Sequence, residues 1–180
     1  DMIHKDSGSI TILGKDNQDN IELTKEDIGV VLDEVGLPEC LTAQQVGNVM
    51  KHTFRNWDDA EYAQLLKKLA LPEQKRFKAF SRGMKMKLGV AIAMSHNSKL
   101  LILDEATSAL DNATEMLIQS SLEELSKGRT SIVVAHRLST IKNADLICVL
   151  QHGDIVEQGT HEELLSYDSF YSTMYNSQFK

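Results

Sequence analysis

The stretch from Leu100 to Asp111 constrains the fold of this 180-residue chain more than any other. Its first four residues are apolar, and they end abruptly in two adjacent carboxylates, Asp104 and Glu105. Such an apolar run is typical of a parallel strand buried on both faces, and the C-terminal ends of these strands open onto a ligand crevice. Carboxylates at that edge must be hydrated, paired or bound to metal. The pattern predicts an α/β domain with a ligand site there, although a strand that simply exits into solvent gives the same six residues.

The residues after the two carboxylates indicate a family. Ala-Thr-Ser-Ala-Leu-Asp at 106–111 resembles the D-loop that follows the Walker B strand in ATP-binding cassette (ABC) ATPases. The resemblance implies a P-loop NTPase-like α/β fold: a mainly parallel sheet with flanking helices and an inserted helical subdomain. It also implies ATP and Mg²⁺ as cofactors, with Asp104 serving Mg²⁺ and Glu105 polarising the attacking water. The D-loop residues expected near a seam between two such domains are Ser108, Ala109, Leu110 and Asp111.

A Ser-Arg-Gly sequence at 81–83 precedes an apolar pattern that predicts a helix ending near Asn97. The residues expected on one face of this helix are Met84, Leu88, Ala91 and Ile92. A Ser hydroxyl and free backbone N–H groups at the positive end of a helix form an anion site, and a plain Ser N-cap is the alternative. The place just before the Walker B strand resembles that of the ABC signature, in degenerate form because Arg82 and Met84 replace its first Gly and its Gln. The resemblance implies that Ser81, Arg82 and Gly83 contact a nucleotide held mainly by the other subunit.

A second apolar run, Ser131–Ala135, is expected to form another buried parallel strand, with His136 at its tip. A lone His is usually structural, but one beside a carboxylate strand can hydrogen-bond a γ-phosphate. Residues 136–140 resemble the ABC His switch, which implies that His136 holds the γ-phosphate and the water. Farther along, the pattern predicts a hairpin around residues 152–154 and a capping box of Thr160 with Glu163.

The N-terminal residues contain a false phosphate-loop signal. Five residues separate Gly8 from Gly14-Lys15 instead of four, Asp16 replaces the Ser or Thr, and the intervening residues 9–13 alternate like a strand. The family pattern then places the chain's start after the P-loop helix, so the chain is expected to lack its own Walker A. The strand before that loop would be central, adjacent to the strands at 100–103 and 131–135.

Asp33 follows a short buried strand expected at Ile28–Leu32. In ABC ATPases a Gln that reaches Mg²⁺ and the attacking water usually stands there. A carboxylate can still coordinate Mg²⁺, so Asp33 is a candidate metal ligand, and a solvated loop acid is the alternative.

Between the two core segments, at 1–37 and 84–180, residues 38–83 are expected to form the helical subdomain, where a transmembrane partner docks in the family. Asp58 can cap a helix there, with the apolar face supplied by Leu65, Leu66 and Leu69. Trp57 is expected to be a packing residue.

Composition excludes some classes of partner. Acidic residues outnumber basic ones 26 to 19, for a formal charge of -7, which argues against nucleic acid and against adsorption to anionic lipid. Cys40 and Cys148 lack metal-ligand spacing and are expected to be reduced thiols. No apolar run approaches the roughly 20 residues that cross a bilayer, so a membrane function would need another chain to span it.

The resemblance differs between the two halves of the chain. Residues 1–103 are similar to ABC ATPases of small bacterial two-component exporters, in which Phe80–Leu88 is a familiar signature variant. Residues 104–180 are similar to exporters whose ATPase is fused to the membrane domain, for which 128–140 and 154–161 are typical. Since Leu103–Ser108 is common to both, we hypothesise a splice or chimera joined within that string.

The expected function is ATP binding and hydrolysis that energises an exporter-like ABC transporter, although the chain alone is expected to lack competent ATP binding. The resemblance implies a second ABC ATPase domain and a transmembrane subunit as partners, no nucleic acid, and a location on the cytoplasmic face of the membrane. Two alternatives are a non-catalytic ABC-fold fragment or engineered interaction module, and a soluble ABC ATPase not linked to transport.

Overall fold

The computed structural model describes residues 7–16, 25–32, 35–104, 120, 126–135 and 137–178. The chain divides into two compact units, Asp1–Ile132 and Val133–Lys180, and each is described by itself.

The first unit begins with a small hairpin of β1 (Thr11–Ile12) and β2 (Lys15–Asp16), which pair antiparallel. Leu13 and Gly14 both have positive φ, 51° and 77°, which is the geometry of the tight turn that joins two such strands. The strand expected at 9–13 is therefore shorter, and it forms half of a hairpin. Rejection of a phosphate loop at Gly14-Lys15 is confirmed, because these residues form the hairpin turn and its return strand.

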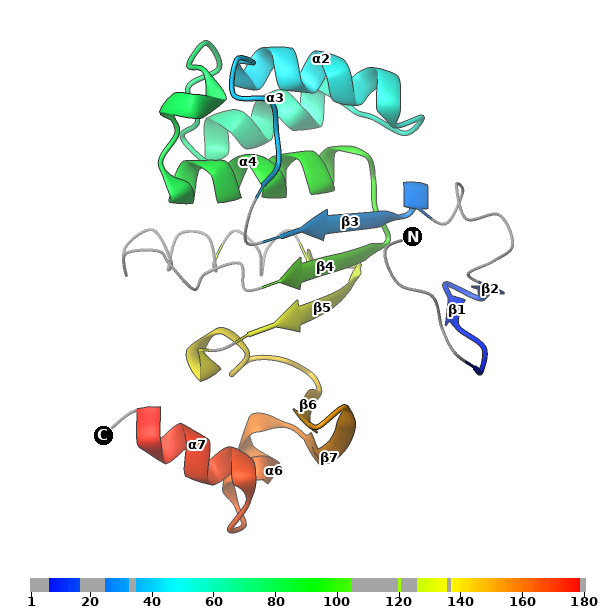
Figure 1. Cartoon of the computed structure of the whole chain (residues 1–180), viewed down its shortest axis with the longest axis vertical. Helices are drawn as coiled ribbons and strands as arrows, with labels where there is room; N and C mark the ends of the chain where they lie inside the picture. Colours follow the sequence, from blue (N-terminus) through cyan, green and yellow to red (C-terminus); the bar gives the residue numbers. More distant parts are fainter. Residues whose placement is uncertain are drawn as a thin grey trace. The chain divides into compact units, whose positions relative to one another are not determined.

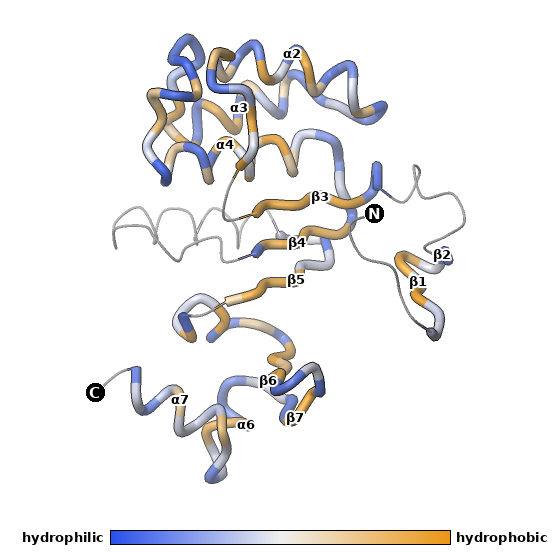
Figure 2. Tube along the Cα trace, viewed as in Figure 1, coloured by the Kyte–Doolittle hydropathy of each residue, from blue (hydrophilic) through white to orange (hydrophobic). Residues whose placement is uncertain are grey.

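The sheet of the first unit has the order β3-β4-β5, with bounds β3 Ile28–Val31, β4 Leu100–Asp104 and β5 Thr130–Val134 (Figure 1). β3 and β4 are parallel, with Val31 opposite Leu103, as expected for a parallel α/β sheet, but Val30 of β3 is 47% exposed, so this strand is buried on one face only. Figure 2 colours β3 and β4 as hydrophobic along nearly all of their length. The strand that the family pattern places between Leu100–Leu103 and Ser131–Ala135 belongs to the segment that the chain is expected to lack, and in this chain β4 and β5 are hydrogen-bonded neighbours.

Helices lie beside β3 in the first unit (Figure 1). Their bounds are α2 Ala43–Thr53, α3 Asp59–Lys68, the 3-10 turn η1 Phe77–Ala79, and α4 Arg82–Ser95. Local caps define where they begin. Thr42 and Gln45 form a reciprocal capping box at α2, and Asp58 accepts the N–H groups of Ala60 and Glu61 at α3. Helices within 38–83 are thus confirmed, while their standing as a separate subdomain remains a proposal.

α4 is buried on more than one face. Leu88 and Ala91 are buried as predicted, but Met84 and Ile92 are only half-buried, whereas Val90 on another side of the helix is fully buried. The single-face prediction fails because α4 packs against α2 and α3 on one side and against β3 on the other. Leu65, Leu66 and Leu69 of α3 share this core, as predicted, and Trp57 packs at its edge.

Gly29 marks the closest approach between β3 and α4. A Cβ built on Gly29 would lie 2.6 Å from the backbone oxygen of Ala93 and 2.8 Å from Ser98 Oγ. Real Cβ atoms essentially never come so near to backbone, so only glycine allows this spacing between strand and helix.

β5 is more exposed than expected. Ile132 is 50% exposed and Val134 is 47% exposed, which contradicts the prediction of a buried strand at Ser131–Ala135. α4 packs against β3, and among the described elements no helix makes comparable contact with β5. An apolar run therefore predicted the strand correctly but not its burial.

The second unit is built around a second hairpin, β6 (Ile147–Gln151) with β7 (Asp154–Gly159), preceded by the 3-10 turn η2 (Leu138–Thr140). His152 and Gly153 form its turn, both with positive φ, so the hairpin predicted there is confirmed. Thr160 and Glu163 form the predicted capping box at α6 (His161–Leu165). The small core of this unit consists of Leu138, Ile147, Leu164 and Tyr171.

A last helix, α7 (Phe170–Gln178), was not predicted from sequence. Ser169, directly before the helix, accepts the N–H of Ser172 at 3.0 Å, and the carboxylate of Glu157 on β7 accepts those of Phe170 at 2.7 Å and Tyr171 at 3.0 Å. Cys40 and Cys148 are free and exposed, and their redox state stays a prediction. None of the helices in the described ranges is long and apolar enough to cross a membrane.

Candidate nucleotide site

The start of α4 has the geometry that the sequence predicts for Ser81, Arg82 and Gly83. Ser81 has extended backbone angles and caps the helix, and its Oγ accepts the N–H of Met84 at 3.3 Å. The N–H groups of the first helical turn have no partner within the helix, and α4 runs for 14 residues behind them, so this end can bind an anion. Ser81 and Arg82 are exposed and Gly83 is half-buried, so the turn is open to a ligand.

Aromatic packing fixes this helix start. Phe77 and Phe80 are both buried just before Ser81, with ring centroids 6.1 Å apart. Lys85 Nζ lies 4.9 Å from the centroid of the Phe77 ring, so a cation is held beside the first turn by cation–π attraction. No acidic residue occurs in this turn. Both the helix dipole and the nearby charge therefore favour an anion here.

A short connection leads from α4 directly into β4. Ser98 donates its hydroxyl to the Ala93 oxygen at 2.9 Å, and Arg129 Nε donates to the Ser98 oxygen at the same distance. Because the chain reverses within this connection, the start of α4 and the end of β4 lie at the same end of the unit, where the arrowhead of β3 also lies (Figure 1). Asp104, the last residue of β4, is half-buried at this end.

The remaining predicted site residues lie outside the described residues: Asp33, Glu105, Ser108, Ala109, Leu110, Asp111 and His136. Their roles stay predictions. In the described ranges, no three His, Cys, Asp or Glu side chains come together as a metal site. A single strand-end carboxylate such as Asp104 still suits Mg²⁺, because this ion keeps several waters and is usually bound through one or two carboxylates plus substrate phosphates.

His96, at the C-terminal end of α4, is a buried polar residue that sequence reasoning did not single out. Its ring stacks on Phe54, its Nε2 lies 3.2 Å from the Ile28 oxygen, and its Nδ1 has no hydrogen-bond partner. Burial lowers the pKa of His96, a nearby Glu26 carboxylate opposes that shift, and Arg129 reinforces it. Nothing in the sequence around a single histidine in an apolar segment distinguishes a buried, stacked ring such as that of His96 from an exposed one.

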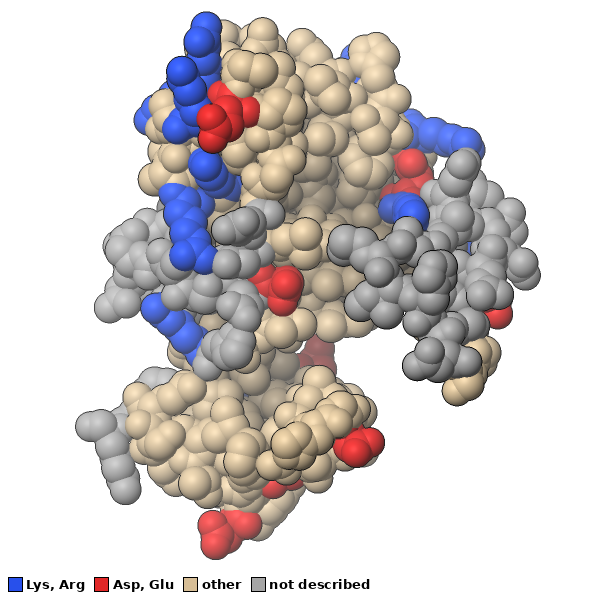
Figure 3. Space-filling model, viewed as in Figure 1, with Lys and Arg blue, Asp and Glu red and all other residues tan. Residues whose placement is uncertain are grey.

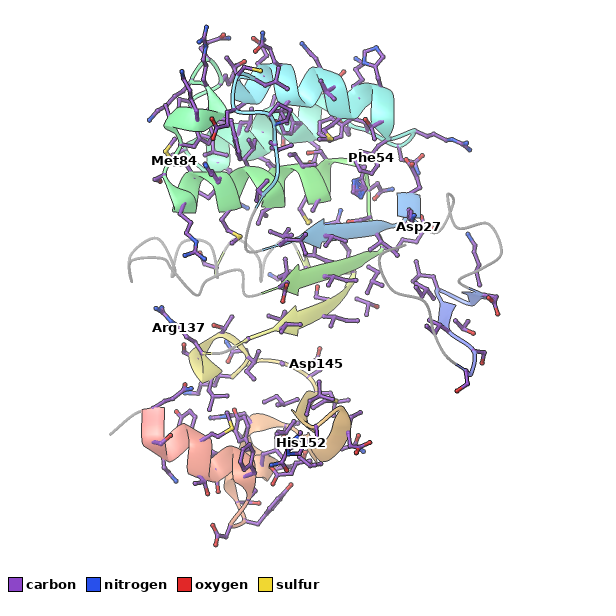
Figure 4. The ribbon with its side chains drawn as sticks, viewed as in Figure 1. Asp27, Phe54, Met84, Arg137, Asp145 and His152 are labelled. Carbon is purple, nitrogen blue, oxygen red and sulfur yellow. The ribbon has the colours of Figure 1, made fainter. Side chains whose placement is uncertain are left out.

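A polar cavity of about 720 Å³ also lies at this end of α4, and its lining includes Asp58, Asn97 and Arg129. Figure 4 labels Met84 in the first turn of α4 and Phe54 beside its other end. The cavity is thus at the opposite end of the helix from Ser81, and we assign it no part in the predicted site.

Comparisons with known proteins agree with the resemblance. The family model described as ABC transporter matches residues 1–108. The ATP-dependent lipid A-core flippase of Bordetella avium is 55% identical over 100 residues, which cover 56% of this chain and 17% of the flippase. Multidrug resistance protein 4 of Entamoeba histolytica is 54% identical over 99 residues, which cover 55% of this chain and 8% of that protein.

Among solved structures, a bacterial Atm1-family ABC exporter with ATP bound matches with a TM-score of 0.82 and 31% identity, over 97% of this chain and 32% of the exporter. The mainly parallel α/β fold is therefore confirmed. The chain spans less than a fifth of the two curated relatives and about a third of the exporter. None of these matches locates a junction within the chain, so the hypothesis of two joined halves stays a prediction.

Proposed function

The chain belongs to the ABC transporter family, and from this premise we propose that it binds and hydrolyses ATP to energise an exporter-like transporter. Nucleotide binding in general follows from the family, whereas the use of ATP with Mg²⁺ is part of the proposal.

One observation carries the proposal. A Ser-capped helix, α4, leads through a four-residue connection into β4, so that its N-terminal end and the terminal carboxylate Asp104 lie at the same end of one compact unit (Figure 1). The N-terminus of the helix and the carboxylate at the end of the strand match the two parts of a magnesium nucleotide. The N–H groups of the helix bind the negative phosphate, and the carboxylate binds the Mg²⁺ cation.

The proposed residue roles follow this division. Ser81 and Gly83 contact the γ-phosphate of a nucleotide held mainly by a second domain, and Arg82 adds positive charge. Asp104 holds Mg²⁺ and Asp33 is a further candidate ligand. Glu105 orients and polarises the attacking water, while His136 hydrogen-bonds the γ-phosphate and that water.

The proposed assembly contains two ABC ATPase domains, head to tail, with residues 108–111 near their seam. A transmembrane subunit, docked on the helical segment 38–83, would hold the pair on the cytoplasmic face of a membrane. The exporter with ATP bound supports this assembly by its similarity in fold.

A complementation assay tests the proposal. The assay uses a second ABC ATPase domain whose own signature serine has been replaced. Paired with itself, this domain still has a Walker A to hold the nucleotide, but neither copy offers an intact signature to the nucleotide of the other. Addition of this chain is expected to restore hydrolysis, and the Ser81→Ala variant is expected to restore it less well. Ser9→Ala, which alters an exposed serine far from α4 in sequence, is the matched control. Failure of the wild-type chain to restore activity would favour a non-catalytic interaction module.

A further inference from the structure

The net charge of -7 conceals a strongly basic segment. Residues 67–87 hold eight of the chain's 19 Lys and Arg and a single carboxylate, Glu73, which is a local excess of seven positive charges. We call these eight cations the basic strip: Lys67, Lys68, Lys75, Arg76, Lys78, Arg82, Lys85 and Lys87. An exclusion based on the charge of the whole chain does not apply to a surface of this kind, because interactions between exposed charges are screened beyond about 10 Å at 0.1 M salt.

The basic strip is a surface feature. Six of its members are exposed, and Lys85 and Lys87 are half-buried. They come from consecutive elements, namely the end of α3, η1 and the start of α4. In Figure 3, Lys and Arg atoms gather along one edge of the face shown, over η1 and the start of α4.

The backbone beneath the strip is held in place. Phe77 and Phe80 point into the core, so the cations that alternate with them, Arg76 and Lys78 among them, face outward. Thr42 and Arg76 form an isolated antiparallel bridge. The N–H of Phe77 also donates to the Leu41 oxygen at 2.8 Å, and that of Lys78 to the Glu39 oxygen at 3.1 Å. The charges therefore sit on a fixed platform, and binding orders only side chains.

The composition of the strip indicates the kind of partner. It contains six Lys and two Arg. Lys presents a compact, hydrated point charge on a flexible stem, whereas Arg is preferred for fixed, bidentate recognition of a carboxylate or phosphate. A Lys-rich strip suits a diffuse anionic surface better than one defined group. Clusters of four to eight Lys and Arg beside a membrane bind acidic lipids, at about 1 kcal/mol for each charge near the surface.

We propose that the basic strip is a docking surface for anionic lipid headgroups. Membership in a family of membrane transporters brings a bilayer within reach of the domain. The lipid contact requires no nucleotide, so it stands or fails separately from the proposed ATPase.

The test is cosedimentation of the whole chain, without nucleotide, with two kinds of vesicle: phosphatidylcholine alone, and phosphatidylcholine mixed with phosphatidylserine. We expect binding to the second kind only. This binding should disappear at 1 M salt, where the Debye length falls to about 3 Å. Binding to both kinds of vesicle, or to neither, overturns the proposal. The salt titration uses the unaltered chain, so its result does not depend on whether a variant folds.

A matched pair of double variants locates the contact. Lys75→Glu with Lys78→Glu removes two charges of the strip, and the expected loss of vesicle affinity is about 30-fold or more. Lys127→Glu with Lys142→Glu makes the same change in net charge at two exposed lysines outside the strip, and should lose far less. Equal losses in both variants would show an effect of net charge alone and overturn the proposal.

Two soluble competitors distinguish the source of the anion. Inorganic phosphate at the total concentration of lipid phosphate should displace the chain only weakly, because it lacks the surface density of headgroups. Polyglutamate should compete less well than phosphatidylserine vesicles. Displacement by phosphate alone overturns the lipid assignment in favour of a free anion, and preferential binding of polyglutamate overturns it in favour of an acidic protein partner.

Discussion

The imidazole of His96 stacks on the phenyl ring of Phe54, with ring centroids 4.0 Å apart and planes inclined by 14°. This contact joins the end of α4 to the residue that follows α2, and the Nε2 of His96 adds a contact to the Ile28 oxygen on β3. A buried histidine thus connects three elements of the first unit.

Acid should destabilise the first unit through His96. Its folded pKa is below the ordinary 6.5, because burial disfavours the charged ring. The unfolded chain therefore binds the proton first, and the stability contributed by His96 is complete above about pH 6.5 and declines as pH falls, by at most about 1.4 kcal/mol per unit. Denaturant titrations between pH 5 and 8 measure this slope. His96→Phe should flatten it while retaining the stack, whereas His52→Gln, at an exposed position, should not. An unchanged slope in His96→Phe would contradict the assignment.

Gly29→Ala should destabilise the chain by about 1 to 3 kcal/mol, because the added methyl would meet the Ala93 backbone oxygen and β3 would have to move away from α4. Chemical denaturation measures the change. Gly36→Ala is the matched control, since nothing lies within 4 Å of a Cβ built there. Equal stability of the two variants would show that the strand and helix are not as closely spaced as described.

Glu105→Gln should abolish hydrolysis and preserve nucleotide binding in a version of the chain extended at its N-terminus by a Walker A segment from a relative. Loss of the proposed base should lower the rate of hydrolysis about 100-fold or more, while the contacts that bind the nucleotide remain. Turnover and equilibrium binding are measured in parallel. Glu162→Gln, on the exposed side of α6, should behave as the parent does. Near-normal turnover in Glu105→Gln would remove the residue from the mechanism.

His136→Ala in the same extended chain should lower kcat with little change in KM, because the proposed contact is with the transferring phosphate and the water. Steady-state kinetics separate the two constants. His52→Ala tests whether loss of any imidazole has this effect. An unchanged kcat with a raised KM would place His136 at the part of the nucleotide that does not react.

The 180-residue chain by itself should bind MgATP weakly or not at all, because its sequence contains no Gly-x-x-x-x-Gly-Lys-Ser/Thr. It should also either self-associate or rearrange to fill the gap left by the missing strand, since Ile132 and Val134 of β5 are about half exposed and strand edges of this kind pair with other chains. Calorimetric titration and sedimentation velocity measure the two properties. A monomer with micromolar MgATP affinity would refute both expectations.

Local signals explain most of what the sequence predicts correctly. The strand at Leu100–Leu103, the cap at Ser81 and the turn at His152-Gly153 each depend on residues that adjoin in sequence, and the structure contains all three. The start of α7 was missed although it has a local cap at Ser169, and its second cap, Glu157, stands 13 positions before Phe170 and gives no local signal. The burial of α4 and the exposure of β5 were predicted wrongly because both depend on which other elements pack against them. The spacing of apolar residues along the sequence does not contain this information. In the candidate site, the anion-binding end of α4 was predictable because its cap is local, whereas His96 at the other end becomes significant only once Phe54 is folded against it.

The two hydrogen bonds from Glu157 to the start of α7 also bear on how the last part of the chain folds. A helix of nine residues is marginal by itself in water, and α7 has no acidic residue in its own first turn. Ser169 Oγ accepts the N–H of Ser172 at 3.0 Å, but the N–H groups of Phe170 and Tyr171 depend on a carboxylate that is in position only when β7 is paired with β6. The β6–β7 hairpin and α7 are consequently expected to fold as one cooperative unit. The amide hydrogens of α7 should then gain or lose protection from solvent exchange together with those of β7.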